Sequence, residues 1–211
     1  MNYGFVKIAS ATPEIRVADC AYNTEAILAL WREADAQGCQ LVAFPELVLT
    51  GATCGDLFLH RTLLDGALAG LKKLTDESAA LRTVAVVGMP LVHQGKLYNC
   101  AVTIHQGEVL SIVPKAVLGD TRIFTPAPEL NTTYSDALLS IGMEETLFGA
   151  RQIYICESMQ DFTFAVGFED DFMAPLPLSA YHAVAGANVL ICLSAGKELV
   201  GRGEYLQQMI G

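Results

Sequence analysis

Short apolar segments that alternate with longer segments of helical periodicity constrain the fold of this chain most. Three of the apolar segments, which contain no charged side chain, are residues 41–44, 84–88 and 189–193. Such segments are typical of strands that are buried on both faces of a sheet. Residues 23–36 and 58–81 place apolar side chains three and four positions apart, which predicts amphipathic helices. The alternation predicts a layered α/β fold.

The remaining segments extend this pattern along the chain. Further strands are predicted at residues 5–9, 97–105, 109–113, 152–156 and 162–168. Residues 97–105 and 109–113 are separated by Gln106-Gly107, which favours a hairpin. Residues 119–145 are less regular, and helices are predicted at residues 178–187 and 198–210. We therefore treat residues 1–211 as one domain.

Composition and charge exclude several classes of protein. The chain has 211 residues, of which 52% are apolar, so a disordered chain is excluded. With 13 basic and 23 acidic residues, the net charge of −10 argues against partners that are nucleic acids or anionic membranes. No apolar run approaches the roughly 20 residues of a membrane span. The first residues do not resemble a signal peptide, so we expect a cytoplasmic protein.

The cysteines, histidines and glycine motifs indicate no metal or cofactor. The six cysteines are scattered without a C-x-x-C pair, which favours reduced and mostly buried thiols. The four histidines lack the spacing of zinc ligands, so no metal site is expected. The chain also lacks the phosphate-binding loop, the dinucleotide fingerprint and the serine nucleophile elbow. No cofactor is therefore expected.

Charged residues follow three of the predicted strands. Glu46 comes after residues 41–44, Lys115 comes after residues 109–113 and Pro114, and three acids begin with Glu169 after residues 162–168. The sites of α/β proteins usually lie at the carboxyl ends of strands, where an unpaired buried charge is costly. Alternatively, Glu46 is a solvated loop residue, Lys115 is an ordinary surface lysine, and the acids cap a helix.

Together these segments resemble the nitrilase (carbon–nitrogen hydrolase) superfamily, and within it the amino-terminal glutaminase domain of glutamine-dependent NAD synthetases. The resemblance is carried by LVAFPELVLTGATCGDLFL (residues 41–59), VVGMPLVHQGKLYNCAVTIHQGEVLSIVPK (residues 86–115) and AGANVLICLSAGKELVGRGE (residues 185–204). It implies an α-β-β-α sandwich and a Glu-Lys-Cys triad. In that triad the Glu is a general base, the Cys attacks the glutamine amide, and the Lys stabilises the oxyanion.

The resemblance assigns two triad residues and leaves the third without a thiol. Glu46 matches the base and Lys115 matches the lysine. The family motif Ile-Cys-Glu-Asp-Leu-Trp precedes a proline-rich turn, and that turn places Glu169 at the cysteine position. A register shifted by one residue places Phe168 there instead. We therefore predict an ionic cluster of Glu46, Lys115 and Glu169 in which Lys115 must neutralise two carboxylates.

Other departures concern the length of the chain and a competing cysteine. The loop after Lys115 is shorter than in the family, and the further strands of the sandwich and the synthetase domain are absent, so the sandwich is expected to be truncated at its C-terminal end. Cys156, in Ile155-Cys156-Glu157, superficially resembles the nucleophile motif. The spacing to the proline-rich turn instead favours a non-catalytic strand cysteine.

Three functional hypotheses follow. The first is a glutamine amidohydrolase-type domain that supplies ammonia for NAD biosynthesis, impaired because the nucleophile position is Glu169. Its ligand would be glutamine or a related amide, and its partner an NAD synthetase domain or subunit. The second is a catalytically silent binding or assembly module, which is expected to form homo-oligomers. The third is a glycosidase that uses Glu46 and Glu169, although no cluster of sugar-binding aromatic residues is visible.

Overall fold

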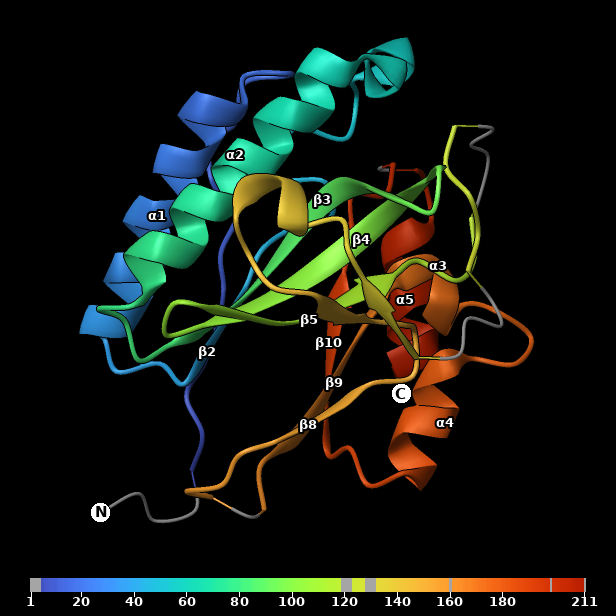
Figure 1. Cartoon of the computed structure of the whole chain (residues 1–211). Coiled ribbons are helices and arrows are strands. Elements are labelled where there is room, and N and C mark those ends of the chain that lie inside the picture. The colour runs from blue at the N-terminus through green and yellow to red at the C-terminus, as the bar shows by residue number, and fades with distance from the viewer. Residues whose placement is uncertain (1–4, 119–122, 128–131, 160, 198, 211) are drawn as a thin grey trace.

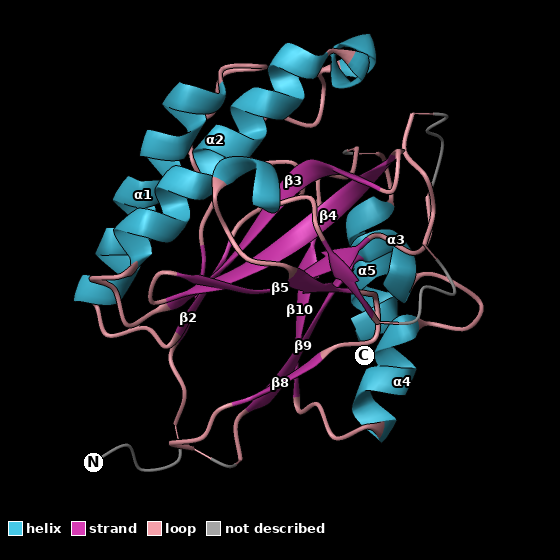
Figure 2. Ribbon diagram, viewed as in Figure 1, coloured by secondary structure: helices cyan, strands magenta, loops and turns pink. Residues whose placement is uncertain are grey.

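Two stacked sheets lie between two layers of helices in the computed structural model (Figures 1 and 2). The structure describes residues 5–118, 123–127, 132–159, 161–197 and 199–210. The predicted α-β-β-α sandwich is therefore confirmed. Within the described residues, no helix is both long and apolar enough to cross a bilayer.

The larger sheet contains the first half of the chain. Its strands, in spatial order, are β1 (Ile8–Ser10), β2 (Leu41–Ala43), β3 (Val84–His93), β4 (Lys96–His105), β5 (Glu108–Pro114), β7 (Thr146–Phe148) and β6 (Thr133–Ser135). β1, β2 and β3 run parallel, and β3, β4 and β5 form antiparallel pairs. The predicted hairpin is present, and Gln106 and Gly107 both have positive φ at its turn.

Two long helices, α1 (Cys20–Ala36) and α2 (Arg61–Ser78), cover the outer face of the larger sheet (Figure 1). The Asp19 side chain accepts a hydrogen bond from the Tyr22 amide and so caps the start of α1. Gly38 follows the end of α1 with a φ of +73°, which a glycine adopts without strain. A 3-10 helix, η1 (Gly55–Leu59), precedes α2.

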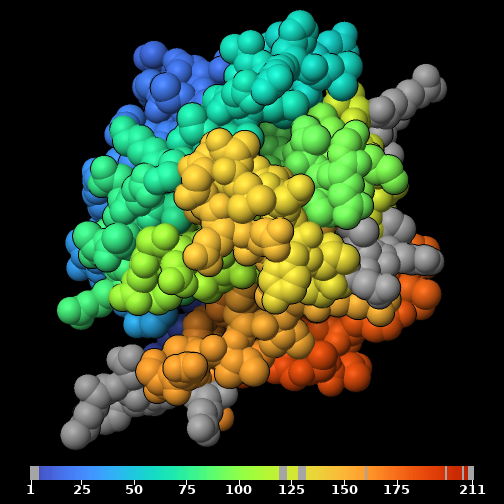
Figure 3. Space-filling view, in the orientation of Figure 1, coloured from blue at the N-terminus to red at the C-terminus, as the bar shows by residue number. Residues whose placement is uncertain are grey.

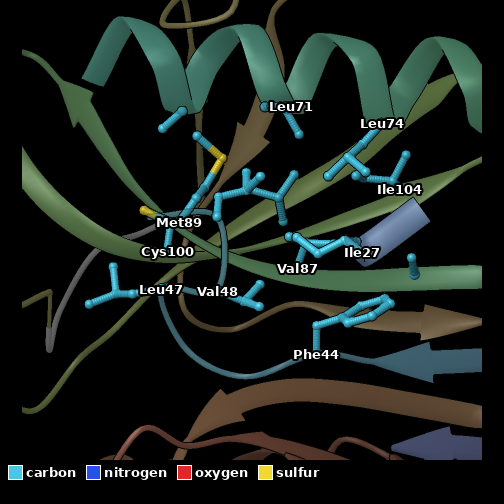
Figure 4. Packing of buried hydrophobic residues seen from close by; sticks show 14 of the residues in the cluster. Ile27, Phe44, Leu47, Val48, Leu71, Leu74, Val87, Met89, Cys100 and Ile104 are labelled. Atoms are coloured by element: carbon cyan, nitrogen blue, oxygen red, sulfur yellow. The ribbon is translucent and has the colours of Figure 1, made fainter. Parts of the chain in front are cut away.

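Apolar side chains from both helices fill the space above this face. Ile27 of α1 and Leu71 of α2 point toward Val87 and Met89 of β3 (Figure 4). These side chains are fully buried, and each contributes about 1.5–3 kcal/mol relative to exposure. Because side chains alternate across a strand, Val86 of β3 points to the other face and joins the core between the sheets.

The smaller sheet contains the last strands of the chain. Its spatial order is β10 (Val189–Leu193), β9 (Thr163–Phe168) and β8 (Ile153–Ile155), with β10 parallel and β8 antiparallel to β9. The helices α3 (Glu169–Phe172), α4 (Leu178–Val184) and α5 (Arg202–Ile210) lie on its outer side (Figure 1). Phe164, Val166 and Phe168 of β9 and Ile191 and Leu193 of β10 pack against the larger sheet. The carboxyl end of β9 therefore faces the end of the larger sheet.

The least regular part of the sequence differs most from expectation. Residues 119–145 contain β6 and a short 3-10 helix, η2 (Leu139–Ile141), and β7 follows them. The segment from β6 to β7 covers the middle of the face shown in Figure 3, beside α2. The final helix begins at Arg202 rather than residue 198, which lies outside the described residues. All six cysteines are unpaired and four are buried, as the sequence predicted.

Candidate functional site

The loop that follows β2 holds Glu46 against the neighbouring strand β3. Glu46 is 9% exposed, and the Leu49 amide donates to the carbonyl oxygen of Gly88 at 3.3 Å. A Cβ built on Gly88 would lie 2.5 Å from both the backbone nitrogen of Leu47 and the carbonyl oxygen of Pro45. Leu47 has a φ of +54°, a left-handed conformation that costs about 1–2 kcal/mol. A glycine and a strained leucine thus allow Glu46 to reach this strand end.

Glu46 and Lys115 form a buried ion pair. Lys115 follows β5 directly, and its amide donates to the carbonyl oxygen of Asn99 on β4 at 2.8 Å. Its Nζ lies 2.8 Å from Glu46 Oε1, and Lys115 is only 7% exposed. Asn99 Nδ2 donates to the same carboxylate oxygen at 2.5 Å. The structure therefore brings together the two residues that the sequence placed at separate strand ends, and it adds Asn99 to them.

A second carboxylate, from Asp170, also pairs with Lys115. Asp170 Oδ2 lies 2.7 Å from the Nζ atom. Burial opposes the charge on Lys115, but attraction to Glu46 and Asp170 outweighs it, so the pKa of Lys115 is raised above its ordinary 10.5. Lys115 is therefore a cation at neutral pH. The two carboxylates differ in environment, because the Asp170 side chain is 44% exposed and that of Glu46 is 10% exposed.

Glu169 does not pair with Lys115, so the predicted ionic cluster is wrong in its third member. The Glu169 carboxylate accepts hydrogen bonds from the Ser194 hydroxyl and from the Arg202 guanidinium. Successive side chains on a helix point about 100° apart, so Glu169 and Asp170 face different partners. The ion-paired cluster consists of Glu46, Lys115 and Asp170. Glu169 instead links the start of α5 to the end of β10.

Asp171 holds the segment that follows Lys115. Its Oδ1 atom accepts from the amides of Ala116 at 3.0 Å and Val117 at 2.6 Å. Its Oδ2 atom is buried and has no hydrogen-bond partner among the described residues. Burial raises the pKa of Asp171 from 3.8 to about 6, against the lowering effect of the amides and of Lys115. This carboxyl therefore changes charge within one or two pH units of neutrality.

Phe168 faces the ion-paired cluster from the end of β9. Its ring centroid lies 5.6 Å from the Nζ atom of Lys115, which is within the range of a cation–π contact. The side chain is fully buried in the core between the two sheets. An aromatic ring, which has no nucleophilic atom, therefore lies beside the two residues that match the base and the lysine of the triad.

Neither of the two cysteines outside the buried core is arranged as a nucleophile. Cys156 follows β8, and its amide donates to the carbonyl oxygen of Phe162, next to the start of β9. It therefore lies at the opposite end of β9 from Phe168, about 20 Å away at the usual rise per strand residue. Burial of the Cys192 sulfur, with nearby carboxylates led by Glu169, raises the pKa of that thiol to about 12. A reactive cysteine needs a lowered pKa.

Five cavities of the structure lie away from this cluster, and the described residues contain no group arranged to hold a metal ion. Five cavities of about 260 to 570 Å³ are lined by described residues, and none of the five is lined by Glu46, Lys115 or Asp170. In the same part of the chain, no group of three or more His, Cys, Asp or Glu residues is arranged to hold a metal ion.

Sequence reasoning missed several residues of the site. Asn99 lies in the middle of an apolar strand, where a polar residue buried to 2% exposure requires a partner. That placement was the available signal for Asn99. Asp170 and Asp171 belong to the acidic run after β9, but the sequence alone does not show which acid of a helical turn faces which partner. Ser194 and Arg202 carried no comparable signal.

Comparisons with known proteins identify the family to which this chain belongs. A profile of the carbon–nitrogen hydrolase family matches residues 7–159, a match that ends before β9. Over 204 residues, the chain is 36% identical to the glutamine-dependent NAD(+) synthetase of Mycobacterium tuberculosis and 32% identical to that of Mycobacterium leprae. Each alignment covers 96% of this chain and 30% of the relative. The chain therefore spans less than a third of the length of these relatives.

Solved structures with low sequence identity share the fold. A glutamine-dependent NAD(+) synthetase from Cytophaga hutchinsonii superposes with a TM-score of 0.82 at 22% identity, over 97% of this chain and 33% of that one. A mutant amidase from Nesterenkonia sp. AN1 in complex with butyramide gives a TM-score of 0.69 at 20% identity, over 97% of this chain and 71% of that one. The fold is thus shared with an NAD(+) synthetase and with an amidase.

Proposed function

Because the chain belongs to the carbon–nitrogen hydrolase family, we propose that it is a glutaminase-type domain whose amidase reaction is impaired. The observation that carries this proposal is the ring of Phe168 beside the buried Glu46–Lys115 pair, while burial and nearby carboxylates raise the pKa of the neighbouring Cys192 thiol. The proposed ligand is glutamine or a related primary amide. The proposed consumer of ammonia in an active relative of this domain is an NAD synthetase domain or subunit.

The roles proposed for the two residues follow from their geometry. Glu46 is buried and accepts two hydrogen bonds on its Oε1 atom. Among the described residues, no hydrogen bond to its second oxygen is seen, and that oxygen could accept a proton from a nucleophile. Lys115 is a cation that faces the same space and would stabilise an oxyanion. Phe168 offers no thiol to these two groups, and the raised pKa of the Cys192 thiol disfavours the thiolate that would form a thioester with the amide.

Ammonia release from L-glutamine tests this proposal. The purified chain and its Lys115→Met variant are assayed side by side, because the variant removes the oxyanion-stabilising cation. We expect both proteins to release ammonia no faster than buffer, since the step that fails precedes oxyanion stabilisation. Release by the natural chain at a rate that Lys115→Met abolishes is the result that would refute an impaired reaction.

A second candidate function, an assembly module without catalysis, is favoured by exposed apolar side chains near α4. Leu176 is 76% exposed, Val184 is 91% exposed and Tyr181 is 47% exposed. Large apolar side chains gathered on one surface favour association. We propose self-association through this surface, and light scattering after size-exclusion chromatography tests it. A dimer that Val184→Lys converts to a monomer is expected, and a monomer at every concentration contradicts this second candidate.

A further inference from the structure

The junction between β9 and α3 determines which side chain enters the site. Phe168 is the last residue of β9, with extended backbone angles of −123° and 156°, and pairs in register with Leu193 of β10. Glu169 is the first residue of α3. Since the backbone changes from strand to helix between them, the two side chains leave the chain in different directions. Phe168 enters the core between the sheets, whereas Glu169 turns toward α5.

Lys115 distinguishes these two positions. Its ammonium group carries three N–H donors, and two of them have carboxylate partners, Glu46 at 2.8 Å and Asp170 at 2.7 Å. The ring of Phe168 also lies near this cation, with its centroid 5.6 Å from the Nζ atom. Both carboxylate oxygens of Glu169 accept hydrogen bonds, one from the Ser194 hydroxyl and one from the Arg202 guanidinium. Position 168 therefore faces the cation, and position 169 does not.

We infer that position 168, rather than position 169, is the place where a nucleophile in this chain would meet Glu46 and Lys115, and that the ring of Phe168 fills this place. The inference rests on the proposed function, because it assumes a nucleophile that acts between a carboxylate base and a lysine. It selects the register shifted by one residue, which the sequence left open, over the ungapped register in which the proline-rich turn placed Glu169 at the nucleophile position. The packing of β9 against the larger sheet turns the side chain of Phe168 toward Lys115, whereas the spacing to the proline-rich turn had favoured Glu169.

The ring lies among buried side chains of the site. Glu46, Lys115 and Phe168 all have low exposure, and none of the five cavities described above is lined by Glu46 or Lys115. A cysteine at position 168 would be smaller than phenylalanine and would leave space beside Lys115. The same substitution at position 169 would instead remove the partner of Arg202 and leave the ring in place.

A matched pair of engineered thiols tests the inference. Phe168→Cys and Glu169→Cys are each made in a chain that carries Cys156→Ser and Cys192→Ser, which removes the two cysteines outside the core. The thiol pKa of each is measured from thiolate absorbance, as the difference from the parent with the two serines. This readout requires no access for a reagent and no enzymatic turnover.

Charge changes at the cluster are then expected to act on one thiol only. Adding Lys115→Met should raise the pKa of the thiol at position 168 by at least one unit, since a nearby cation favours the thiolate. Adding Glu46→Gln should lower that pKa for the converse reason. Both changes should leave the thiol at position 169 within about 0.3 units, whereas Arg202→Gln should raise its pKa. A thiol at position 169 that responds to Lys115→Met as strongly as the thiol at position 168 overturns the inference.

A second measurement keeps the inference testable if Phe168→Cys does not fold. Phe168→Leu retains an apolar side chain of moderate size but removes the ring. In spectra of the chain with labelled lysines, the Lys115 ε-methylene signal should shift with Phe168→Leu and stay in place with Glu169→Gln. The reverse pattern would exclude position 168. Ammonia release by the natural chain would refute the proposed function, yet it would leave both of these measurements interpretable.

Discussion

At the scale of single residues, the site depends on charges that are buried and mutually satisfied. Glu46 shares one oxygen between Lys115 and Asn99, and Lys115 shares its charge between Glu46 and Asp170. A buried ion pair adds little net stability, but removal of one partner leaves the other uncompensated. The cluster should therefore tolerate paired changes better than single ones.

Lys115→Met should lower the free energy of unfolding by about 3–5 kcal/mol, because it leaves Glu46 buried without its cation. Denaturant titration measures the change. Lys72→Met is the control, since Lys72 pairs with Asp76 at the surface and should lose less than about 1 kcal/mol. The double variant with Glu46→Gln should recover part of the loss, and strictly additive losses would contradict a coupled pair.

Gly88→Ala should destabilise the chain by about 3 kcal/mol or more, because the new methyl group would overlap the backbone of the loop that carries Glu46. The matched control is Gly203→Ala in α5, where an added Cβ meets nothing within 4 Å. The control should be neutral or more stable by up to about 1 kcal/mol, since alanine favours a helix. Equal losses in the two variants would show that the close contact between this loop and β3 does not contribute to the stability of the chain.

Glu46 and Lys115 could be predicted as a pair, but their full set of partners could not. Each follows an apolar strand, and strand ends on one edge of a sheet lie close together, so their proximity follows from the pattern. The third partner lies on α3, where a difference of one residue rotates a side chain by about 100°. An error of one position along α3 was therefore enough to assign Glu169 to Lys115 and to miss Asp170, which is its actual partner.

At the scale of elements, one turn of helix connects three parts of the molecule. In α3, Glu169 contacts Arg202 at the start of α5, Asp170 contacts Lys115 after β5, and Asp171 contacts the amides of Ala116 and Val117. The acids also lie in the first turn of the helix, where negative charge is favoured. The alternative that these acids cap a helix is thus compatible with their contacts at the site.

Asp171 gives the stability of the chain a dependence on pH. Burial raises the pKa of this carboxyl from 3.8 to about 6 in the folded chain, so it favours folding most below about pH 4. That contribution is lost as the pH rises through 6, to the extent of about 3 kcal/mol at 1.4 kcal/mol per pKa unit. Asp171→Asn keeps an oxygen for the two amides and does not ionise.

Relative to the natural chain, Asp171→Asn should therefore gain stability between pH 4 and pH 7.5. Denaturant titration across this range measures the difference in the free energy of unfolding between the two proteins. Asp65→Asn, an exposed carboxylate of α2 that pairs with Arg61, serves as the control and should show no comparable trend. A difference that stays constant with pH, or that grows toward acidic pH, contradicts the assignment of a raised pKa to Asp171.

Elements with strong apolar patterns could be predicted, whereas those defined by long-range contacts could not. The core strands β3, β9 and β10 and the helices α1 and α2 follow from runs and periodicities in the sequence. β6 and β7 contain three residues each, too few to show a period, and they form because they pair with each other and with β5. Their existence depends on contacts that a local pattern does not contain.

At the scale of the whole molecule, the sandwich brings two sheets together so that strand ends from both converge. The larger sheet contributes Glu46 and Lys115, and the smaller sheet contributes Phe168 and α3. The fold therefore holds a carboxylate and a cation together at these strand ends, and the proposed loss of the nucleophile does not require this pair to separate. Family membership and loss of the reaction are consistent with each other on this account.

The central claim is that no cysteine of the natural chain acts as a nucleophile at this site. Incubation with a glutamine analogue that carries a diazoketone, followed by intact-mass measurement, tests it most directly, because such a group alkylates an activated thiol that recognises glutamine. We expect the mass to stay unchanged. A single adduct that maps to one cysteine, forms faster than free cysteine reacts, and disappears in the presence of glutamine would contradict the account.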